Sequence, residues 1–466
     1  PFVANFSRDS FPSGLFALVD SGATGDGGSI SIDTRAIEIL RGAQLLAYTD
    51  GEGNAGDVAL RATDSVRVVG ASENGLTRSN ISAIIRPLAN GDGGQLTVET
   101  SLLEVLDTAF VSVTSFGNGR GGSLSVSADN VTVRGASATN ELIFGGIFAE
   151  VRSPDRISGL GLTGEATGNG GSVTLEASDR VAILDGGAIS VLTDTTGNGG
   201  DLTLRADVVE IGGVVEIPDA DPSNLPYNRA NISAGAEELG RGGTLTIEAN
   251  ELIVRDGGLV SVGTQGSGNA GNLTVIARES ATVEGVRTVT TNGLTLLPSS
   301  ITASSENTVI GPASGNAGSL ELTVGDLVVR DGGRISVSSD NQGSTGDLQI
   351  QAETIVLLDS GRITAESVLG DRGNIRINSE TLQLRSGSRI DANATRDATG
   401  GNVSISADTV AALEQSNISA SAVAGSGGRI DIETSGLFLS PGSAIDARLE
   451  ERPVGTECRS RWSPYP

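Results

Sequence analysis

The sequence has 466 residues, a formal net charge of −26 and only 3% aromatic residues, with 66 glycines and neither methionine nor histidine. So few large side chains cannot fill several rounded globular cores, whereas 37% hydrophobic residues are too many for a disordered polymer. The acidic charge argues against a nucleic-acid partner, and no run approaches the roughly 18 apolar residues of a membrane helix. We therefore expect a thin core with many turns, no nucleic-acid partner and no insertion into a membrane.

The first apolar alternation lies at Phe16 and Leu18. A short alternation of this kind is typical of a β-strand, and here it resembles the last strand of a repeat unit. We expect the chain to be a piece of a longer array of such units.

From residue 25 onward, a glycine-rich box followed by an apolar alternation recurs thirteen times. The first box reads GDGGSISI at 25 to 32 and the last reads GSGGRIDI at 425 to 432. The basic spacing between boxes is 27 to 29 residues, and four spacings are longer, at 38, 49, 43 and 47 residues. A fixed period of this length predicts a stacked repeat architecture.

Each repeat contains three short apolar alternations, as in Ile375 with Ile377, Leu382 with Leu384, and Ile390 with Ala392. Residues of period 2 point to one face of a strand, and a single repeat cannot bury that face alone. Stacked repeats bury it by pairing each strand in parallel with its equivalent above and below. The sequence therefore predicts an all-β fold, a right-handed parallel β-helix (β-solenoid) of about 13 three-strand coils of 27–29 residues over residues 1–447.

The surplus residues of the longer repeats fall mainly between the second and third strands, at 70 to 79, 135 to 145, 212 to 229 and 285 to 299. A further insert at 152 to 166 follows a third strand. Loops from alternate coils should line up along one edge, about 10 Å apart. Such an edge is either a binding surface or a corner at which insertions accumulate at little energetic cost.

Residues 448–466 show no alternation and include the single cysteine, Cys458. We expect an irregular tail that caps or leaves the last coil, or that is disordered. One cysteine excludes a disulfide within the chain.

The boxes, together with a recurring DGGxISV turn at 185 to 191, 256 to 262 and 331 to 337, resemble the filamentous haemagglutinin family of two-partner secretion exoproteins. The likeness is nearest to the large cyanobacterial members with GNGG-type repeats, and it covers residues 12 to 447. The resemblance implies a secreted, cell-surface protein that is exported through an outer-membrane transporter partner. It further implies a β-helical shaft used for adhesion to a glycan or another cell-surface receptor.

Four aspartates, Asp185, Asp256, Asp331 and Asp359, follow the second strand of their coils. Asp331 and Asp359 belong to neighbouring coils and are the candidate Ca²⁺ ligands, since hard cations take oxygen ligands. Asp before Gly is also a favoured turn residue, and this second interpretation is preferred. The aspartates of the glycine boxes, among them Asp26, Asp57, Asp92, Asp201 and Asp347, are interpreted in the same way.

No catalytic or cofactor-binding residue is predicted, and we expect the protein not to be an enzyme. The alternative class is a polysaccharide lyase or hydrolase, because parallel β-helices also serve such enzymes. The candidate pairs for that class, Asp371–Arg372 and Arg330–Asp331, are ordinary turn residues of the repeat. An autotransporter or spike-type passenger is the other alternative. The sequons at Asn80 and Asn417 are expected to be corner asparagines rather than glycosylation sites.

Overall fold

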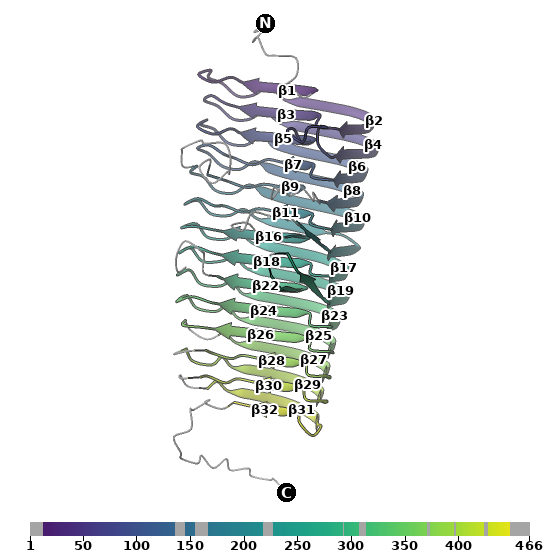
Figure 1. Cartoon of the computed structure of the whole chain (residues 1–466), viewed down its shortest axis with the longest axis vertical. Helices are drawn as coiled ribbons and strands as arrows, with labels where there is room; N and C mark the ends of the chain where they lie inside the picture. The colour runs from purple at the N-terminus through teal and green to yellow at the C-terminus, as the bar shows by residue number, and fades with distance from the viewer. Residues whose placement is uncertain are drawn as a thin grey trace.

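The computed structural model describes residues 13–135, 145–153, 166–217, 227–291, 293–306, 314–370, 373–395, 398–423 and 427–447. These residues form a rod of stacked coils that progresses regularly from one end to the other (Figure 1). Two long parallel sheets run the length of the rod. The predicted parallel β-solenoid is thereby confirmed, whereas residues 1–12 and the predicted tail at 448–466 lie outside the described residues.

The long-strand sheet contains one strand from each of thirteen coils, one of them divided in two. Its strands are β2 (Ile30–Leu40), β4 (Val58–Val69), β6 (Gln95–Leu106), β8 (Ser123–Arg134), β10 (Ser172–Leu184), β12 (Leu202–Arg205) with β13 (Val208–Gly212), β17 (Leu245–Arg255), β19 (Leu273–Glu284), β23 (Leu320–Arg330), β25 (Leu348–Leu357), β27 (Ile375–Leu384), β29 (Val403–Ala412) and β31 (Ile430–Leu439). Neighbouring coils contribute neighbouring strands, and all pairings in this sheet are parallel.

The short-strand sheet contains the third strand of every coil. Its strands are β1 (Gly14–Val19), β3 (Gln44–Thr49), β5 (Asn80–Ile85), β7 (Phe110–Ser112), β9 (Gly146–Phe148), β11 (Ala188–Ser190), β16 (Asn231–Ala236), β18 (Leu259–Thr264), β22 (Ser300–Ser305), β24 (Arg334–Ser339), β26 (Arg362–Ser367), β28 (Arg389–Asp391), β30 (Asn417–Ser419) and β32 (Ala444–Asp446). Two antiparallel hairpins project from the stack, β14 (Val214–Glu216) with β15 (Tyr227–Arg229) and β20 (Val286–Val289) with β21 (Thr295–Pro298).

The first two predicted strands of a coil are joined in one long strand rather than separated by a turn. In β4, the buried alternation of Val58 and Leu60 continues into that of Val66 and Val68. The corner between them is marked by a shift of pairing register, as between Ala62 and Ser65. The chain therefore turns this corner while it keeps most of its ladder hydrogen bonds.

The core is a continuous column of aliphatic residues between the two sheets. Ile375 pairs with Val403 and Ile377 with Ile405, and all four are at most 1% exposed, as the sequence predicts. In the described part of the chain, no aromatic side chain belongs to this main core. Because each buried aliphatic side chain contributes about 2 kcal/mol, the stack is stabilised by many equal increments rather than by one large centre.

The glycines of the boxes are required by the contact between neighbouring coils. A Cβ atom at Gly200 would lie 1.5 Å from the carbonyl oxygen of Gly171, and one at Gly243 would lie 1.6 Å from that of Gly200. Real Cβ atoms do not approach a carbonyl so closely, so only glycine lets these backbones stack directly. The recurring GNGG and GDGG sequences are thus a packing requirement of the solenoid.

Polar residues of the same boxes form a second ladder between coils. The Asp57 carboxylate accepts a hydrogen bond from the Gln95 backbone N–H at 2.8 Å, and Asp347 accepts one from Asn374 at 3.1 Å. Asn198 plays the same part toward Arg241. These contacts satisfy backbone donors that the loops leave outside the sheets.

The strand β1 belongs to an earlier coil, as the sequence predicts, because it pairs in parallel with β3. The residues that face the core are Ala17 and Val19, which lie opposite Ala47 and Thr49. Phe16 and Leu18, on which the prediction rests, instead point outward and are 43% and 48% exposed.

Candidate functional site

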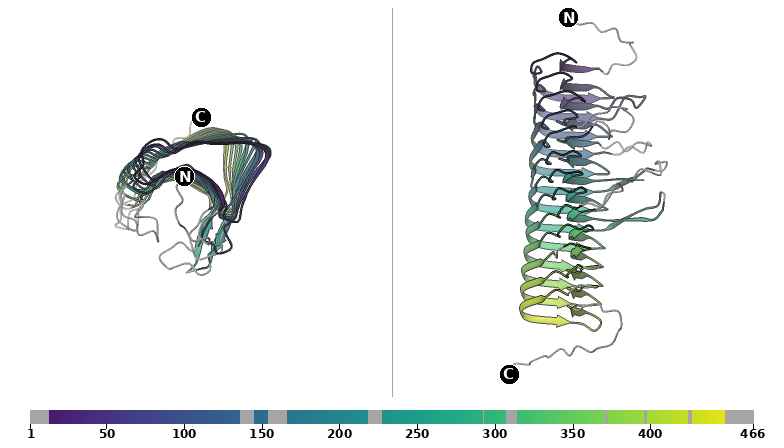
Figure 2. Two further views of the ribbon diagram at one scale, coloured as in Figure 1. Left: turned by 90° about the horizontal axis from the view of Figure 1, so that it is seen from above. Right: turned by 90° about the vertical axis from the view of Figure 1, so that its left-hand side faces the viewer.

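The outward face of the short-strand sheet is unusual because several of its side chains are buried although they point away from the core. Ser336 in β24 is 4% exposed and Thr364 in β26 is 1% exposed. On the long-strand sheet, by contrast, the outward residues Glu321 and Thr323 are exposed. Seen down the rod, the short strands form a curved layer with loops projecting beyond both of its ends (Figure 2). This face is therefore the floor of a groove.

Between β16 and β26 the groove has a volume of about 610 Å³. Five short strands lie side by side in this segment, so at about 4.8 Å per strand the floor is about 20 Å long. One wall comes from the hairpins and the other from the loops that follow the short strands. We call this segment the central groove.

The hairpin wall confirms the predicted alignment of inserted loops. The inserts at 212 to 229 and 285 to 299 emerge at the same corner (Figure 2), and their side chains Val214, Val289 and Leu297 pack into a small cluster with Tyr227 at its edge. The insert at 70 to 79 occupies the equivalent place nearer the N-terminus, and a bridge between Ala71 and Arg78 closes it. The inserts at 135 to 145 and 152 to 166 lie largely outside the described residues.

Arg229 fastens the hairpin wall across three coils. Its guanidinium donates hydrogen bonds to the carbonyl oxygens of Gly257 at 2.8 Å, Gly258 at 3.1 Å and Pro298 at 2.8 Å. Burial lowers the pKa of Arg229 to about 10. The two hairpins are further linked by Glu216, whose carboxylate accepts hydrogen bonds from Thr290 and Thr291 at 3.3 Å. The wall is therefore a built structure rather than a pair of independent loops.

The opposite wall is acidic. It presents Glu237, Glu306 and Asp340, which follow β16, β22 and β24, whereas Gln265 follows the intervening β18. Glu366, an outward residue of β26, adds a fourth carboxylate. Burial, and then the neighbouring Glu366 carboxylate, raise the pKa of Asp340 above its ordinary value, while Arg334 acts in the opposite direction.

Arg334 lies on the floor of the central groove, beside the acidic wall. Its guanidinium donates hydrogen bonds to Glu366 at 3.1 Å and to the Thr364 hydroxyl at 3.2 Å. The residues that line the central groove include four carboxylates but only two cations, Arg229 and Arg334. An anionic ligand would therefore meet net repulsion there.

The remainder of the floor is a column of hydroxyl groups. Ser233, Ser261, Thr302 and Ser336 follow one another in strict register on adjacent strands. In the described part of the chain, the hydroxyls of Ser261, Thr302 and Ser336 have no hydrogen-bond partner, although Ser336 is almost fully buried in the groove. Such groups are available to a ligand that offers donors and acceptors of its own.

Toward the N-terminus the same face changes character. Its outward residues include Phe16, Tyr48, Phe110 and Phe148. The Arg78 guanidinium lies 4.2 Å from the centroid of the Phe110 ring, and burial lowers the pKa of Arg78 to about 10. We call this segment the aromatic segment.

A second arginine of the aromatic segment covers a ring in the same way. Arg86 lies 4.3 Å from the centroid of the Tyr48 ring, and its Nη1 lies 3.7 Å from Asp50 Oδ2. Burial raises the pKa of Asp50, while Arg86 opposes that shift. Two of the rings in this segment are therefore covered by cations of the protein itself.

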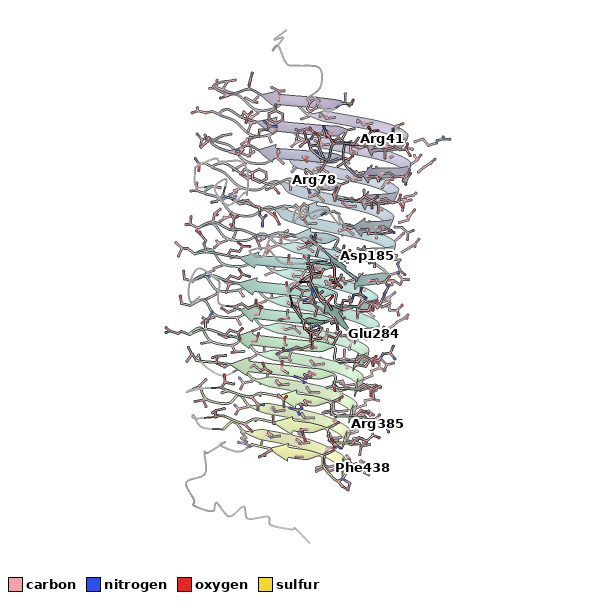
Figure 3. All side chains as sticks on the ribbon, viewed as in Figure 1. Arg41, Arg78, Asp185, Glu284, Arg385 and Phe438 are labelled. Atoms are coloured by element: carbon pink, nitrogen blue, oxygen red, sulfur yellow. The ribbon has the colours of Figure 1, made fainter. Side chains whose placement is uncertain are left out.

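The aspartates singled out in the sequence occupy turns. Asp185, Asp256, Asp331 and Asp359 all have positive φ, between 46° and 54°, as the turn interpretation requires. Figure 3 shows Asp185 at the edge where the long strands end and the chain turns toward the short strands. Within the described ranges, no three or more His, Cys, Asp or Glu side chains come close enough to hold a metal ion. The candidate Ca²⁺ ligands Asp331 and Asp359 therefore lack a third acidic partner there.

The other candidates also have structural roles. Asn80 is 3% exposed and donates to the Arg78 carbonyl, and Asn417 accepts a hydrogen bond from the Ala444 backbone N–H. Arg330 donates to Glu284 at 2.6 Å, with Asp331 3.8 Å away, outside the central groove. Asp371 and Arg372 lie outside the described residues.

The inserts that form the hairpin wall of the central groove were predicted from the sequence, whereas its floor and acidic wall were not. The sequence does contain a signal for the residues of the floor. Aligning the third strands at the 28-residue period places Glu366 opposite Ser338 and Arg334 opposite Arg362. The curvature that buries these outward positions is a property of the assembled stack.

No family model, curated protein or solved structure matches the chain. No helix in the described part of the chain is long and apolar enough to cross a membrane.

Proposed function

We propose that this chain is the shaft of a secreted or cell-surface adhesive exoprotein that attaches through its groove and hairpin edge. The observation that supports the proposal is the pairing of a uniform aliphatic stack with one differentiated surface, on which hairpins from alternate coils wall a groove of about 610 Å³. A repeat array that varies mainly along one edge is typical of extended binding proteins.

Export belongs to the same proposal and rests on the resemblance to two-partner secretion exoproteins. The chain would then leave the cell through an outer-membrane transporter and fold outside. Co-expression of the full-length protein with and without its transporter, followed by protease treatment of intact cells, tests this step. Protein that remains protected from protease when the transporter is present would contradict it.

Adhesion is tested with a hairpin deletion. Residues 286 to 298 are replaced by the short turn of the preceding coil, Asp256–Gly257, which connects its strands without an insert. The variant should keep the β-sheet circular dichroism and thermal melting of the parent, because the removed residues contribute nothing to the main core. Attachment of beads coated with the variant to target cells should fall. Unchanged attachment would exclude the hairpin edge as the adhesive surface.

A glycan-cleaving enzyme is the second candidate, and one observation favours it. The central groove brings Arg334, Asp340 and Glu366 together, and the raised pKa of Asp340 is suited to a general acid. The assay is release of reducing or unsaturated ends from polysaccharides, with Asp340→Asn as the control variant. Release that the Asp340→Asn substitution abolishes would replace the adhesive proposal by an enzymatic one.

A further inference from the structure

We infer that the central groove binds a chain of uncharged sugars that lies along the rod axis. The inference names a ligand for the proposed adhesive function and rests on that function only for its biological meaning. Sugar binding by the groove can be tested on the purified protein, without cells. Three features of the groove support it: an apolar wall, a hydroxyl floor and an acidic wall.

The apolar wall suits the carbon face of a sugar ring. Tyr227 and Pro298 line the groove from the two hairpins, and Leu259 adds an aliphatic side chain at the foot of the wall. Tyr227 is supported from behind by the cluster of Val214, Val289 and Leu297. A ring held in this way presents apolar area at little further loss of side-chain entropy.

The floor and the acidic wall suit the hydroxyl groups of the same sugar. Thr302 and Ser336 offer unpartnered hydroxyls at a spacing of one strand per coil, about 4.8 Å. Glu306 and Glu366 offer carboxylate oxygens on the facing side, and hydrogen bonds to ionised acceptors are the stronger ones. An apolar ligand would leave the Thr302 and Ser336 hydroxyls unpaired.

Charge excludes the polyanionic sugars. The lining contains four carboxylates and two arginines, and Arg334 is already engaged by Glu366 while Arg229 is engaged by three carbonyls. Uronate or sulfate groups would therefore meet more carboxylates than arginines, and both of these arginines are already engaged. The repeating geometry of the floor, about 20 Å long, favours a linear chain over a single sugar.

The test is a titration of the purified protein with hexasaccharides of uniform length. The uncharged probes are the hexamers of β-1,4-glucose, β-1,3-glucose, β-1,4-mannose and β-1,4-N-acetylglucosamine, and the charged probe is hexagalacturonate. We expect at least one uncharged hexamer to bind and hexagalacturonate to bind at least about tenfold more weakly. Absence of binding by every uncharged hexamer, or preferential binding of hexagalacturonate, would overturn the inference.

The matched variants are Thr302→Trp and Thr323→Trp. Thr302 points into the groove from β22, whereas Thr323 is exposed on the opposite sheet. Thr302→Trp should fill the floor and weaken binding at least about tenfold, and Thr323→Trp should leave it unchanged. Should Thr302→Trp fail to fold, Tyr227→Ala against Tyr227→Phe provides the same comparison, since only the alanine variant loses the ring. If all of these variants bound the sugar with equal affinity, the sugar could not be bound in the central groove.

The adhesion assay with the same variants separates this inference from the proposed function. Sugar binding that requires the groove, without any attachment to cells, would support the inference and contradict the adhesive function. Attachment that persists in Thr302→Trp, with no sugar bound by the parent protein, would support the adhesive function and overturn the inference.

Discussion

The aromatic segment and the central groove are two stretches of one face that have the same kind of inward residue and different outward residues. In both, the inward positions of the short strands are small or medium aliphatic residues, Val111 in the first and Ile335 in the second. Outward, the first presents rings covered by arginines and the second presents hydroxyls flanked by carboxylates. Folding thus constrains one set of positions and leaves the other free to specify what the face contacts.

The largest effect is expected at the inward positions, which are aliphatic in both segments. Ile335→Asp places a charge in the aliphatic core and should destabilise that part of the rod by more than about 4 kcal/mol. The matched control is Thr323→Asp on the exposed outward face of β23, which should cost less than about 1 kcal/mol. Chemical denaturation followed by circular dichroism measures both. Comparable losses from the two variants would refute the division into inward and outward positions.

The next effect distinguishes the segments by ligand binding. Tyr227→Ala should reduce the affinity for an uncharged hexasaccharide about tenfold, because it removes the apolar wall of the central groove. Phe148→Ala, in the aromatic segment, should change it less than about twofold, since Phe148 does not line that groove. Isothermal titration calorimetry is the measurement. A similar loss in both variants would extend the binding face along the rod.

A smaller effect concerns the stability of the aromatic segment. Arg78 and Phe110 should show a coupling energy of about 1 kcal/mol in a double-mutant cycle with alanine, because the guanidinium lies over the ring. The equivalent cycle for Ser304 and Ser338, which are paired in the central groove, should give no measurable coupling. Coupling of the same size in both pairs would show that the cation and ring make no special contribution.

The smallest effect is a pH dependence confined to the central groove. The raised pKa of Asp340 means that the folded state binds its proton more readily than the unfolded chain does. Asp340 therefore lowers stability above its folded pKa, and this loss is relieved as the pH falls through that value. Asp340→Asn should raise the denaturation midpoint slightly at pH 7 and have no effect at pH 3. A midpoint lowered at pH 7 would contradict the assignment of the shift to burial and Glu366.

The sequence predicts the stack because inward positions obey a strict pattern. Ile375, Leu382 and Ile390 each recur one coil later as an aliphatic residue in register, and the period alone locates them. The pattern fails at β1, where Leu15, Phe16, Ala17 and Leu18 are all apolar, so alternation cannot show which side is inward. It also fails at the corner of the long strands, because backbone pairing rather than side-chain pattern decides whether the strand is interrupted.

The floor and the acidic wall of the central groove could not be predicted from the sequence for a different reason. Its floor can be aligned from the period, but Ser336 is buried only in the assembled groove, and Thr364 only because Arg334 of the neighbouring coil donates to its hydroxyl. Arg229 illustrates the limit, since its partners Gly257 and Pro298 lie 28 and 69 residues further along the chain. No local pattern marks a side chain whose hydrogen bonds are all to carbonyls.

The close stacking of coils through their glycine boxes has a mechanical consequence. The ladder hydrogen bonds between coils point along the rod. A force that pulls on the two ends of the rod therefore acts along these bonds, and the interfaces between coils bear it in series. Release of one coil of 27 to 29 residues would lengthen the molecule by about 90 Å. We expect stretching of single molecules to give force peaks of that spacing, with four longer steps from the repeats of 38, 49, 43 and 47 residues. A tethered shaft would then dissipate tension stepwise while its remaining coils stay folded.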